Sequence, residues 1–281
     1  MAFDRHQRER FDDVAEWYDR VRPGYPAVVL TELICRTRVP DEGAILEIGC
    51  GTGQLTKSLA ERGYRITAIE LGQNLSQRAA RNLSPFPSAT VVHADFETWD
   101  PEGAQFDVVC SAQAFHWIDP EIGYTKTHRL LRPGGSLALL WNLYPRQDGP
   151  MRRALDGIYR ERAPVLAARR TVDSLGARIR RTLSQIAASG FFSRPTLFTH
   201  PWTATYTTET YEMLLRTFSD HASLPAATRE HLLQGIRELI DASGGTIDRP
   251  QVSVLFVAHS LLSESASLTE NENGSDHSFH Y

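Results

Sequence analysis

The fold is decided by an eight-residue stretch, Leu46-Glu47-Ile48-Gly49-Cys50-Gly51-Thr52-Gly53. It begins inside the short apolar run 44–48, ends in three closely spaced glycines, and is followed by a helical pattern through Thr56, Leu59 and Ala60. A strand that runs into a glycine turn and then a helix is typical of the first unit of a doubly wound sheet. Because glycine has no Cβ, the backbone of such a turn can come close to a ligand. The stretch therefore predicts a strand, a ligand-binding loop over 49–53 and a helix.

Short apolar runs alternate with helical patterns on the C-terminal side of this loop. Further strands are predicted over 65–70, 90–95, 106–111, 136–141 and 250–258, with an extended segment over 195–207. Helices are predicted over 73–83, 121–131, 209–218 and 226–242, with one or two Arg-rich helices over 151–189. Strands that alternate with helices pair in parallel, and their crossovers cover both faces of the sheet. We therefore expect an α/β fold with a doubly wound, mostly parallel, seven-stranded sheet.

The composition limits the possible partners. The chain has 281 residues, of which 41% are hydrophobic, enough for a sizeable core. Lys plus Arg is 30 and Asp plus Glu is 34, so the net charge of 30 − 34 = −4 does not favour general nucleic-acid binding. No apolar run approaches the ~20 residues that span a bilayer, and the first residues lack the apolar core of a signal peptide. We therefore expect a cytoplasmic protein with no nucleic-acid or membrane partner.

The three cysteines, Cys35, Cys50 and Cys110, are too sparse for a disulfide framework and lack the spacing of a metal site. We expect buried, reduced thiols and no bound metal.

Acidic residues stand at the ends of the first three predicted strands. Glu47 precedes the glycine loop, where a carboxylate suits an ammonium group, and Glu70 ends the second strand, where a carboxylate can accept both hydroxyls of a ribose. Asp95 and Phe96 end the third strand and offer a hydrogen-bond acceptor and an aromatic face to an adenine ring. Position 54 is Gln where a dinucleotide fingerprint requires glycine, which disfavours a nicotinamide-dependent oxidoreductase.

The glycine stretch resembles motif I of the class I S-adenosylmethionine-dependent methyltransferases. Glu70, Asp95-Phe96 and Leu131-Arg132-Pro133-Gly134-Gly135 match later landmarks of that family in order and spacing. Two other segments, Arg22-Pro23-Gly24-Tyr25-Pro26 and Ser111-Ala112-Gln113-Ala114-Phe115-His116-Trp117, resemble its small-molecule branch, methyltransferase type 11. That branch includes proteins similar to trans-aconitate methyltransferase. The resemblance covers about residues 11–145.

The resemblance implies S-adenosylmethionine as cofactor, S-adenosylhomocysteine as product and a small-molecule acceptor. Tyr18 and Arg22 would close over the methionine end of the cofactor, where Arg22 could pair with its carboxylate. The implied cofactor-binding residues are Tyr18, Arg22, Glu47, Gly49, Gly51, Gly53, Glu70, Leu71, Asp95, Phe96 and Ser111.

The same reading divides the chain into four parts. An N-terminal helical lid covers 1–40 and a cofactor-binding core covers 41–145. A helical substrate cap, inserted after the fifth strand, is combined with the last strands over 146–260. A Ser/Asn/Glu-rich tail over 261–281 is expected to be disordered.

His116 is the predicted catalytic residue, because it follows the fourth strand at the edge where ligands bind. Methyl transfer from a sulfonium is an in-line displacement that requires positioning and the exclusion of water. A base is needed only where the acceptor must lose a proton, and the ordinary pKa of histidine suits that role. For a carboxylate acceptor, His116 would instead donate a hydrogen bond or form part of the wall.

The acceptor itself stays open at this stage. The aromatic residues Trp141, Tyr144, Trp202 and Tyr206 could wall an aromatic acceptor, and the Arg-rich segment 146–181 could receive an anionic one. The alternatives are a methyltransferase that acts on RNA or protein and a protein of this fold that binds the cofactor without methyl transfer. The oligomeric state is not readable from the sequence.

Overall fold

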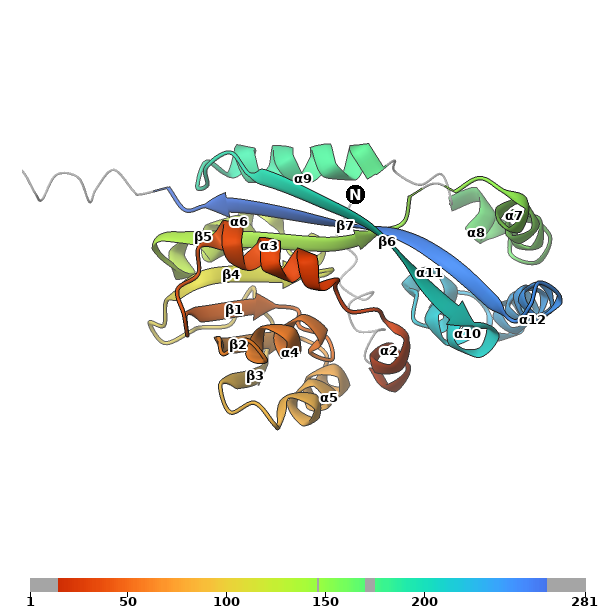
Figure 1. The fold of residues 1–281 in the computed structure, drawn as a ribbon, viewed down its shortest axis with the longest axis horizontal. Coiled ribbons are helices and arrows are strands. Elements are labelled where there is room, and N and C mark those ends of the chain that lie inside the picture. The colour runs from red at the N-terminus through yellow and green to blue at the C-terminus, as the bar shows by residue number, and fades with distance from the viewer. Residues whose placement is uncertain (1–14, 146, 170–174, 262–281) are drawn as a thin grey trace, which may run out of the picture.

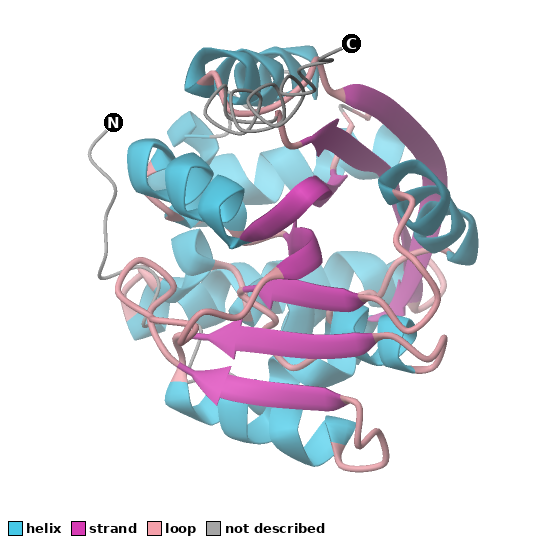
Figure 2. Ribbon diagram, turned by 90° about the vertical axis from the view of Figure 1, so that its left-hand side faces the viewer, coloured by secondary structure: helices cyan, strands magenta, loops and turns pink. Residues whose placement is uncertain are grey.

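The computed structural model describes residues 15–145, 147–169 and 175–261. They form a seven-stranded sheet in the order β3-β2-β1-β4-β5-β7-β6 (Figure 1). The strands are β1 (Ala44–Ile48), β2 (Arg65–Glu70), β3 (Ala89–His93), β4 (Phe106–Ala112), β5 (Leu131–Leu143), β6 (Thr196–Thr207) and β7 (Thr246–His259). The first five pair in parallel, and β7 is antiparallel to both β5 and β6. The predicted α/β, doubly wound, mostly parallel, seven-stranded sheet is confirmed, and Figure 2 shows the twist of its strands.

Helices cover both faces of the sheet, as crossovers between parallel strands require. Helices α3 (Ala27–Thr37), α4 (Gln54–Ala60) and α5 (Gln73–Leu83) bury Leu33, Leu59 and Leu83 against one face. Helices α6 (Pro120–Leu130) and α9 (Leu175–Ser189) bury Tyr124 and Ile186 against the other. The strands between these two cores are apolar on both sides, which explains their nearly continuous apolar sequence.

Two strands are longer than predicted. β5 begins at Leu131, ahead of Gly134-Gly135, because Leu131 pairs with Phe106 before the register shifts. β7 begins at Thr246 and pairs with the whole of β6, from Thr207 to Thr196. The outer half of this ribbon extends beyond the end of β5 (Figure 1).

The outer ribbon carries a separate group of helices, which we call the cap. It consists of α7 (Pro150–Arg162), α8 (Pro164–Arg169), α10 (Thr208–Arg216), α11 (Ser219–Ala222) and α12 (Ala226–Ala242). These helices share a hydrophobic core of their own, built around Tyr211, Leu214, Leu232 and Ile236. Val21 of α2 (Ala15–Val21) is buried in the same core, so the N-terminal helix packs on the cap.

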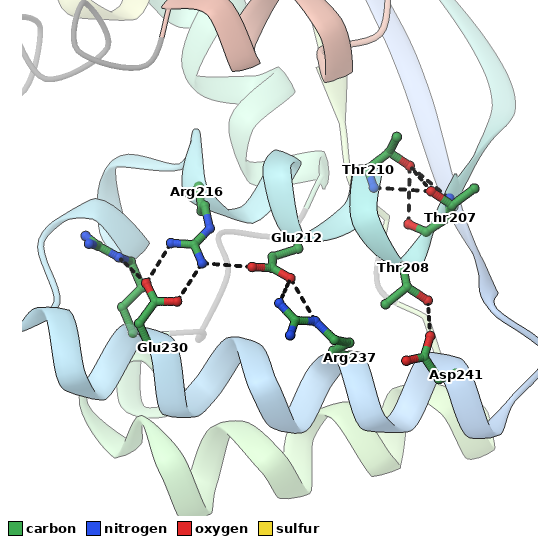
Figure 3. A network of polar contacts seen from close by, with 9 residues as sticks. Thr207, Thr208, Thr210, Glu212, Arg216, Glu230, Arg237 and Asp241 are labelled. Atoms are coloured by element: carbon green, nitrogen blue, oxygen red, sulfur yellow. Dashed lines mark hydrogen bonds and ion pairs between the residues drawn. The ribbon is translucent and has the colours of Figure 1, made fainter.

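Charged side chains join α10 to α12 on the surface of the cap (Figure 3). Arg216 contacts both oxygens of Glu230 at 2.6 and 2.7 Å and one oxygen of Glu212 at 2.8 Å. Arg237 donates to the other oxygen of Glu212. Glu212 therefore lies between two guanidinium groups from different helices.

Three further predictions can be compared with the structure. The helical residues expected before Ala15 and the tail over 262–281 lie outside the described residues. Cys35 is exposed, so the expectation that all three cysteines are buried is wrong for it, because its position on α3 faces away from the sheet. No helix within the described ranges is both long and apolar enough to cross a membrane.

Candidate functional site

A pocket of about 1280 Å³ opens at the carboxyl ends of strands β1 to β5. Its volume exceeds the range of about 300–1,000 Å³ that is usual for a site holding one small ligand. Residues from both the sheet and the cap line it, including Tyr18, Arg22, Gly49, Gly51, Glu70, Leu71, Asp95, Phe96, His116, Tyr144, Tyr159, His221 and Arg249. Its charged groups are Arg22, Arg152, Arg153, Arg178, Arg249, Glu70, Asp95, Asp148, Asp156 and Asp220. The structure thus brings together eight of the eleven predicted cofactor-binding residues and His116.

The glycine loop forms the floor of the pocket after β1. Gly49 and Gly51 have positive φ angles of 70° and 60°, a region that favours glycine. A Cβ on Gly49 would lie 2.3 Å from the Cβ of Ala114, so the loop that follows β4 packs directly on this glycine. The N–H groups of Gly49 and Cys50 donate to the carbonyl of Ile69, which holds the loop against the end of β2.

Glu70, the last residue of β2, is held by backbone hydrogen bonds. Its Oε2 accepts from the N–H of Gly51 at 2.8 Å, and its Oε1 accepts from the N–H of Gly72 at 2.9 Å. The neighbouring Leu71 also lines the pocket. The carboxylate of Glu70 is therefore held at the end of β2 by the backbone of the two loops that follow β1 and β2.

Asp95 and Phe96 follow β3, which ends at His93, two residues earlier than predicted. The Oδ1 of Asp95 accepts from the N–H of Glu97 at 2.9 Å, which fixes the turn. The Phe96 ring is buried, and the ammonium group of Lys126 lies 5.1 Å from its centroid. An acceptor and an aromatic surface therefore meet at the third strand end.

Three predicted cofactor-binding residues do not line the pocket: Glu47, Gly53 and Ser111. Glu47 points into the interior, where only 1% of its surface is exposed, and accepts a hydrogen bond from Thr56 at 2.6 Å. Burial raises the pKa of Glu47 to about 8, although the bond from Thr56 opposes the shift. Ser111 donates to the carbonyl of Ile48 at 2.8 Å, and Gly53 is the N-cap of α4. Glu47 and Ser111 lie behind the loop because they are strand positions of a parallel sheet that is covered on both sides, and Gly53 ends the loop at α4.

Tyr18 and Arg22 bring α2 to the pocket. A Cβ on Gly51 would lie 3.6 Å from Cε1 of Tyr18, and the Arg22 guanidinium lies 5.0 Å from the Tyr18 ring centroid. The Nε and Nη2 of Arg22 donate to the hydroxyl and the carbonyl of Thr217 at 3.0 and 2.9 Å. The Nε–Nη2 edge of the guanidinium is therefore bonded to Thr217, the residue that follows α10.

His116 lies in a short 3₁₀ turn, Phe115–Trp117, and its imidazole faces the pocket. The surrounding protein disfavours the charged ring and lowers the pKa of His116 to about 4, and the positive charge of Arg178 acts in the same direction. The indole N–H of Trp141 donates to Nδ1 at 3.3 Å. With Nδ1 as acceptor, the proton of the neutral ring is on Nε2. At neutral pH His116 thus offers a hydrogen-bond donor and is a weak base.

The structure adds a hydrogen-bonded chain that the sequence did not indicate. The hydroxyl of Tyr159 lies 2.7 Å from Nε2 of His221, and Nδ1 of His221 lies 2.6 Å from Oδ1 of Asp220. All three residues line the pocket. They come from α7 and α11, 62 positions apart, so no local spacing could have signalled them.

The other predicted groups divide between the pocket and the core. Of the four aromatic residues expected as walls, Tyr144 lines the pocket. Trp141 and Tyr206 are buried in hydrophobic cores, and Trp202 donates to Ser253 on β7. Within the described ranges, His, Cys, Asp and Glu form no cluster of three or more that could hold a metal ion.

The strand order and the glycine turn define a Rossmann-like fold of the class I methyltransferase type. Residues 46–139 match the family model described as a methyltransferase domain. This part of the chain therefore carries a methyltransferase domain.

Individual proteins resemble the chain in sequence or in fold. An uncharacterized methyltransferase of Mycobacterium tuberculosis is 33% identical over 150 residues, which is 53% of this chain and 58% of that protein. The match thus spans little more than half the length of this relative. A structure described as a type II methyltransferase from Anaeromyxobacter dehalogenans is 25% identical with a TM-score of 0.54, covering 85% of this chain and 96% of that one. The methyltransferase of Thiobacillus denitrificans, solved with S-adenosyl-L-homocysteine, has a TM-score of 0.52 at 14% identity and covers 89% and 97%.

Proposed function

We propose that the pocket binds S-adenosylmethionine at the sheet and a small-molecule acceptor under the cap, and that the protein transfers the methyl group between them. The observation that carries this proposal is the single pocket that runs from Gly49 and Glu70 to Tyr159 and His221. Its volume leaves room for a second molecule beside a cofactor.

The residues at the sheet fit the cofactor. Glu70 ends β2 and lines the pocket with a carboxylate, a group that can accept hydrogen bonds from the two ribose hydroxyls. Asp95 and Phe96 offer the adenine ring an acceptor and an apolar face. Gly49 and Gly51 present bare backbone to the methionine portion, and Tyr18 covers this region from α2. Glu47 lies behind the loop, so we assign it a supporting role.

Bound S-adenosylmethionine supplies an electrophilic methyl group on a sulfonium. The chain has to hold the acceptor in line with that group and exclude water. Tyr18 and Arg22 close the pocket from the N-terminal side, because Arg22 ties α2 to Thr217 of the cap. His116 directs its Nε2–H into the pocket and can hold an acceptor oxygen by hydrogen bonding.

Two kinds of acceptor remain compatible with this arrangement. A carboxylate needs no base, which suits the low pKa of His116. A phenol or amine must lose a proton, and the chain from Tyr159 through His221 to Asp220 is arranged to take it. The acceptor pocket is enclosed by the cap, which supports a small molecule over RNA or protein.

Calorimetry with S-adenosylhomocysteine and with NADH tests the cofactor assignment. We expect S-adenosylhomocysteine to bind and NADH not to bind. Glu70→Ala should weaken the binding by about tenfold or more, since a hydrogen bond to a charged group contributes about 1.5–3 kcal/mol. Glu61→Ala, an exposed carboxylate at the end of α4, is the matched control. Unchanged affinity in Glu70→Ala would remove Glu70 from the ribose site.

A methyl-transfer screen of small carboxylic acids, phenols and amines then distinguishes an enzyme from a cofactor-binding protein. Transfer to a small molecule supports the proposal. Binding of S-adenosylhomocysteine without transfer to any small acceptor, together with transfer to RNA or protein, would contradict it.

A further inference from the structure

Arg249 on β7 lines the pocket, and its guanidinium makes one hydrogen bond within the described residues. Its Nη1 donates to the hydroxyl of Tyr211 at 2.7 Å, and its Cζ lies 4.3 Å from the ring centroid of Tyr144. Its Nε and Nη2 have no hydrogen-bond partner among the described residues. These two nitrogens form the side of the guanidinium that matches the two oxygens of a carboxylate.

Three other half-buried arginines have a counter-charge or use the same edge. Arg216, with a side chain 19% exposed, contacts Glu212 and Glu230, and Arg78 contacts Asp19 at 2.9 Å. Arg22 has bonded its Nε and Nη2 to Thr217. Arg249, in contrast, lies within ion-pair distance of no carboxylate in the described part of the chain.

An enclosed cation without a counter-charge is unfavourable for the folded protein, because desolvation is not offset by an ion pair. The surrounding tyrosine rings reduce this cost through cation–π contact but do not neutralise the charge. An arginine that destabilises the folded protein and lines a pocket is best explained as a binding group for a negatively charged ligand.

Arg249 lies on the acceptor side of the pocket. In the sheet, β7 is three strands from β1, and a strand spacing of about 4.8 Å places it about 14 Å from the glycine loop. Arg249 pairs with Ala204 of β6, beyond the point where Leu143 at the end of β5 pairs with Val252. The cap helix α10 supplies Tyr211. The anion would therefore belong to the acceptor and not to the cofactor.

We propose that Arg249 anchors a planar organic carboxylate of the acceptor through its Nε–Nη2 edge, with Tyr144 stacked on the guanidinium. This inference rests on the proposed function, since it names the class of acceptor for the same pocket. The pocket is lined by five arginines and five carboxylates, so its charges are balanced. That balance disfavours a phosphate dianion, which would face the five acidic side chains.

The test compares ligands of the same shape and different charge. Calorimetry with benzoate, benzamide and inorganic phosphate is carried out on the full chain saturated with S-adenosylhomocysteine, and hexanoate with hexanamide repeats the comparison for a flexible ligand. We expect each acid to bind about tenfold or more tightly than its amide, and more tightly than phosphate. Arg249→Gln should abolish the preference for the acid, and Arg249→Lys should retain part of it.

The controls separate this site from the cofactor site. Arg160→Gln removes one exposed positive charge from α7 outside the pocket and should keep the full preference. Affinity for S-adenosylhomocysteine should be equal in wild type and Arg249→Gln, which also reports that the variant is folded. Loss of that affinity would assign Arg249 to the cofactor and overturn the proposal. Equal binding of acid and amide by the wild type, or tighter binding of phosphate, would overturn it as well.

A failure of the proposed function would appear in a different measurement from a failure of the Arg249 proposal. If S-adenosylhomocysteine does not bind the wild type, the cofactor assignment is wrong. The comparison of acid with amide, repeated without S-adenosylhomocysteine, still decides whether Arg249 binds a carboxylate.

Discussion

At the sheet end of the pocket, Gly49, Glu70 and Asp95 stand at or just after the ends of strands, whereas at the cap end the lining groups come from distant parts of the chain. Gly49, Glu70 and Asp95 are placed by the ends of β1, β2 and β3. Tyr159 and Arg249 are brought together by the cap, whose helices have a separate hydrophobic core. One half of the site is thus defined by local sequence, and the other only by tertiary packing.

This difference suggests a division of function. The sheet end has rigid backbone geometry, which suits a ligand whose chemical structure is constant. The cap end is built from helices on an extended ribbon, where side chains can vary without disturbing the sheet. Variants that change ligand binding or stability at only one end of the pocket would support this division. Variants that change both ends would contradict it.

The largest effect is expected from Gly49→Ala. The substitution places a Cβ 2.3 Å from that of Ala114 and adds a side chain at a φ of 70°. Overpacking of about 1–3 kcal/mol and left-handed strain of about 1–2 kcal/mol together predict a loss of about 2–5 kcal/mol in unfolding free energy. Urea unfolding measures the loss, and calorimetry should show that S-adenosylhomocysteine binding is abolished.

Gly63→Ala is the matched control, because Gly63 has a similar φ of 87° and no atom within 4 Å of the added Cβ. It should lose only the strain of about 1–2 kcal/mol and bind S-adenosylhomocysteine normally. An equal loss in both variants would mean that the close approach of Ala114 does not matter.

Glu47 behind the glycine loop provides a pH-dependent test. Its pKa of about 8 in the folded protein is above the ordinary 4.5, so the folded state binds more protons between these values. Stability is therefore highest below pH 4.5 and decreases as the pH rises through 8. A full shift corresponds to about 5 kcal/mol, and relaxation around the charged group reduces it. Urea unfolding at pH 9 should show Glu47→Gln to be more stable than wild type by about 2–3 kcal/mol.

At pH 4 the two proteins should have nearly equal stability, because Glu47 is then protonated in both the folded and the unfolded state. The exposed Glu61→Gln should show no such dependence on pH. A stability difference that is the same at all pH values would show that the pKa of Glu47 is not raised in the folded protein.

A smaller effect is expected at His116, where the two ends of the pocket meet. Although part of His116 is exposed, desolvation by the surrounding protein is the larger cause of its low pKa, and the charge of Arg178 is the smaller. Arg178→Gln should therefore raise the pKa of His116 but leave it below 6.5, as measured by titration of its ring protons in NMR spectra. A return to 6.5 would mean that charge, and not burial, controls the ring.

The sheet end could be predicted from the sequence because its determinants are local. A short apolar run followed by glycines is compatible with few folds. An acidic residue at the end of a parallel strand must lie at the carboxyl edge of the sheet. Glu70 and Asp95 were found in this way. Glu47 was misplaced because its side chain direction depends on the alternation within β1, which puts it in the interior beside Thr56.

The arrangement of the cap end could not be predicted from the sequence, because it depends on contacts between residues that are far apart in the chain. The bonds between Arg22 and Thr217 join positions 195 apart, so the sequence gives no sign that the guanidinium edge is used. The position of His116 followed from its place after β4, but its state depends on Trp141 and Arg178 from other elements. The Arg-rich segment attracted attention by composition, whereas Arg249 is a single arginine in a strand.

The smallest effect is expected within the cap, at Glu212 between α10 and α12 (Figure 3). Burial alone would raise the pKa of Glu212, but hydrogen bonds from Arg216 and Arg237 keep it below its usual value. Glu212→Gln leaves these two guanidiniums without their shared partner, so we expect a loss of about 1 kcal/mol that shrinks in high salt. Glu32→Gln, which breaks the exposed pair with Arg36 on α3, should lose only a few tenths of a kcal/mol. Because the cap has its own core, amide hydrogen exchange should accelerate in α10 and α12 and stay unchanged in β1 and β4. Equal acceleration in the sheet would show that the two ends unfold as one unit, and the comparison between them would then apply to the site but not to stability.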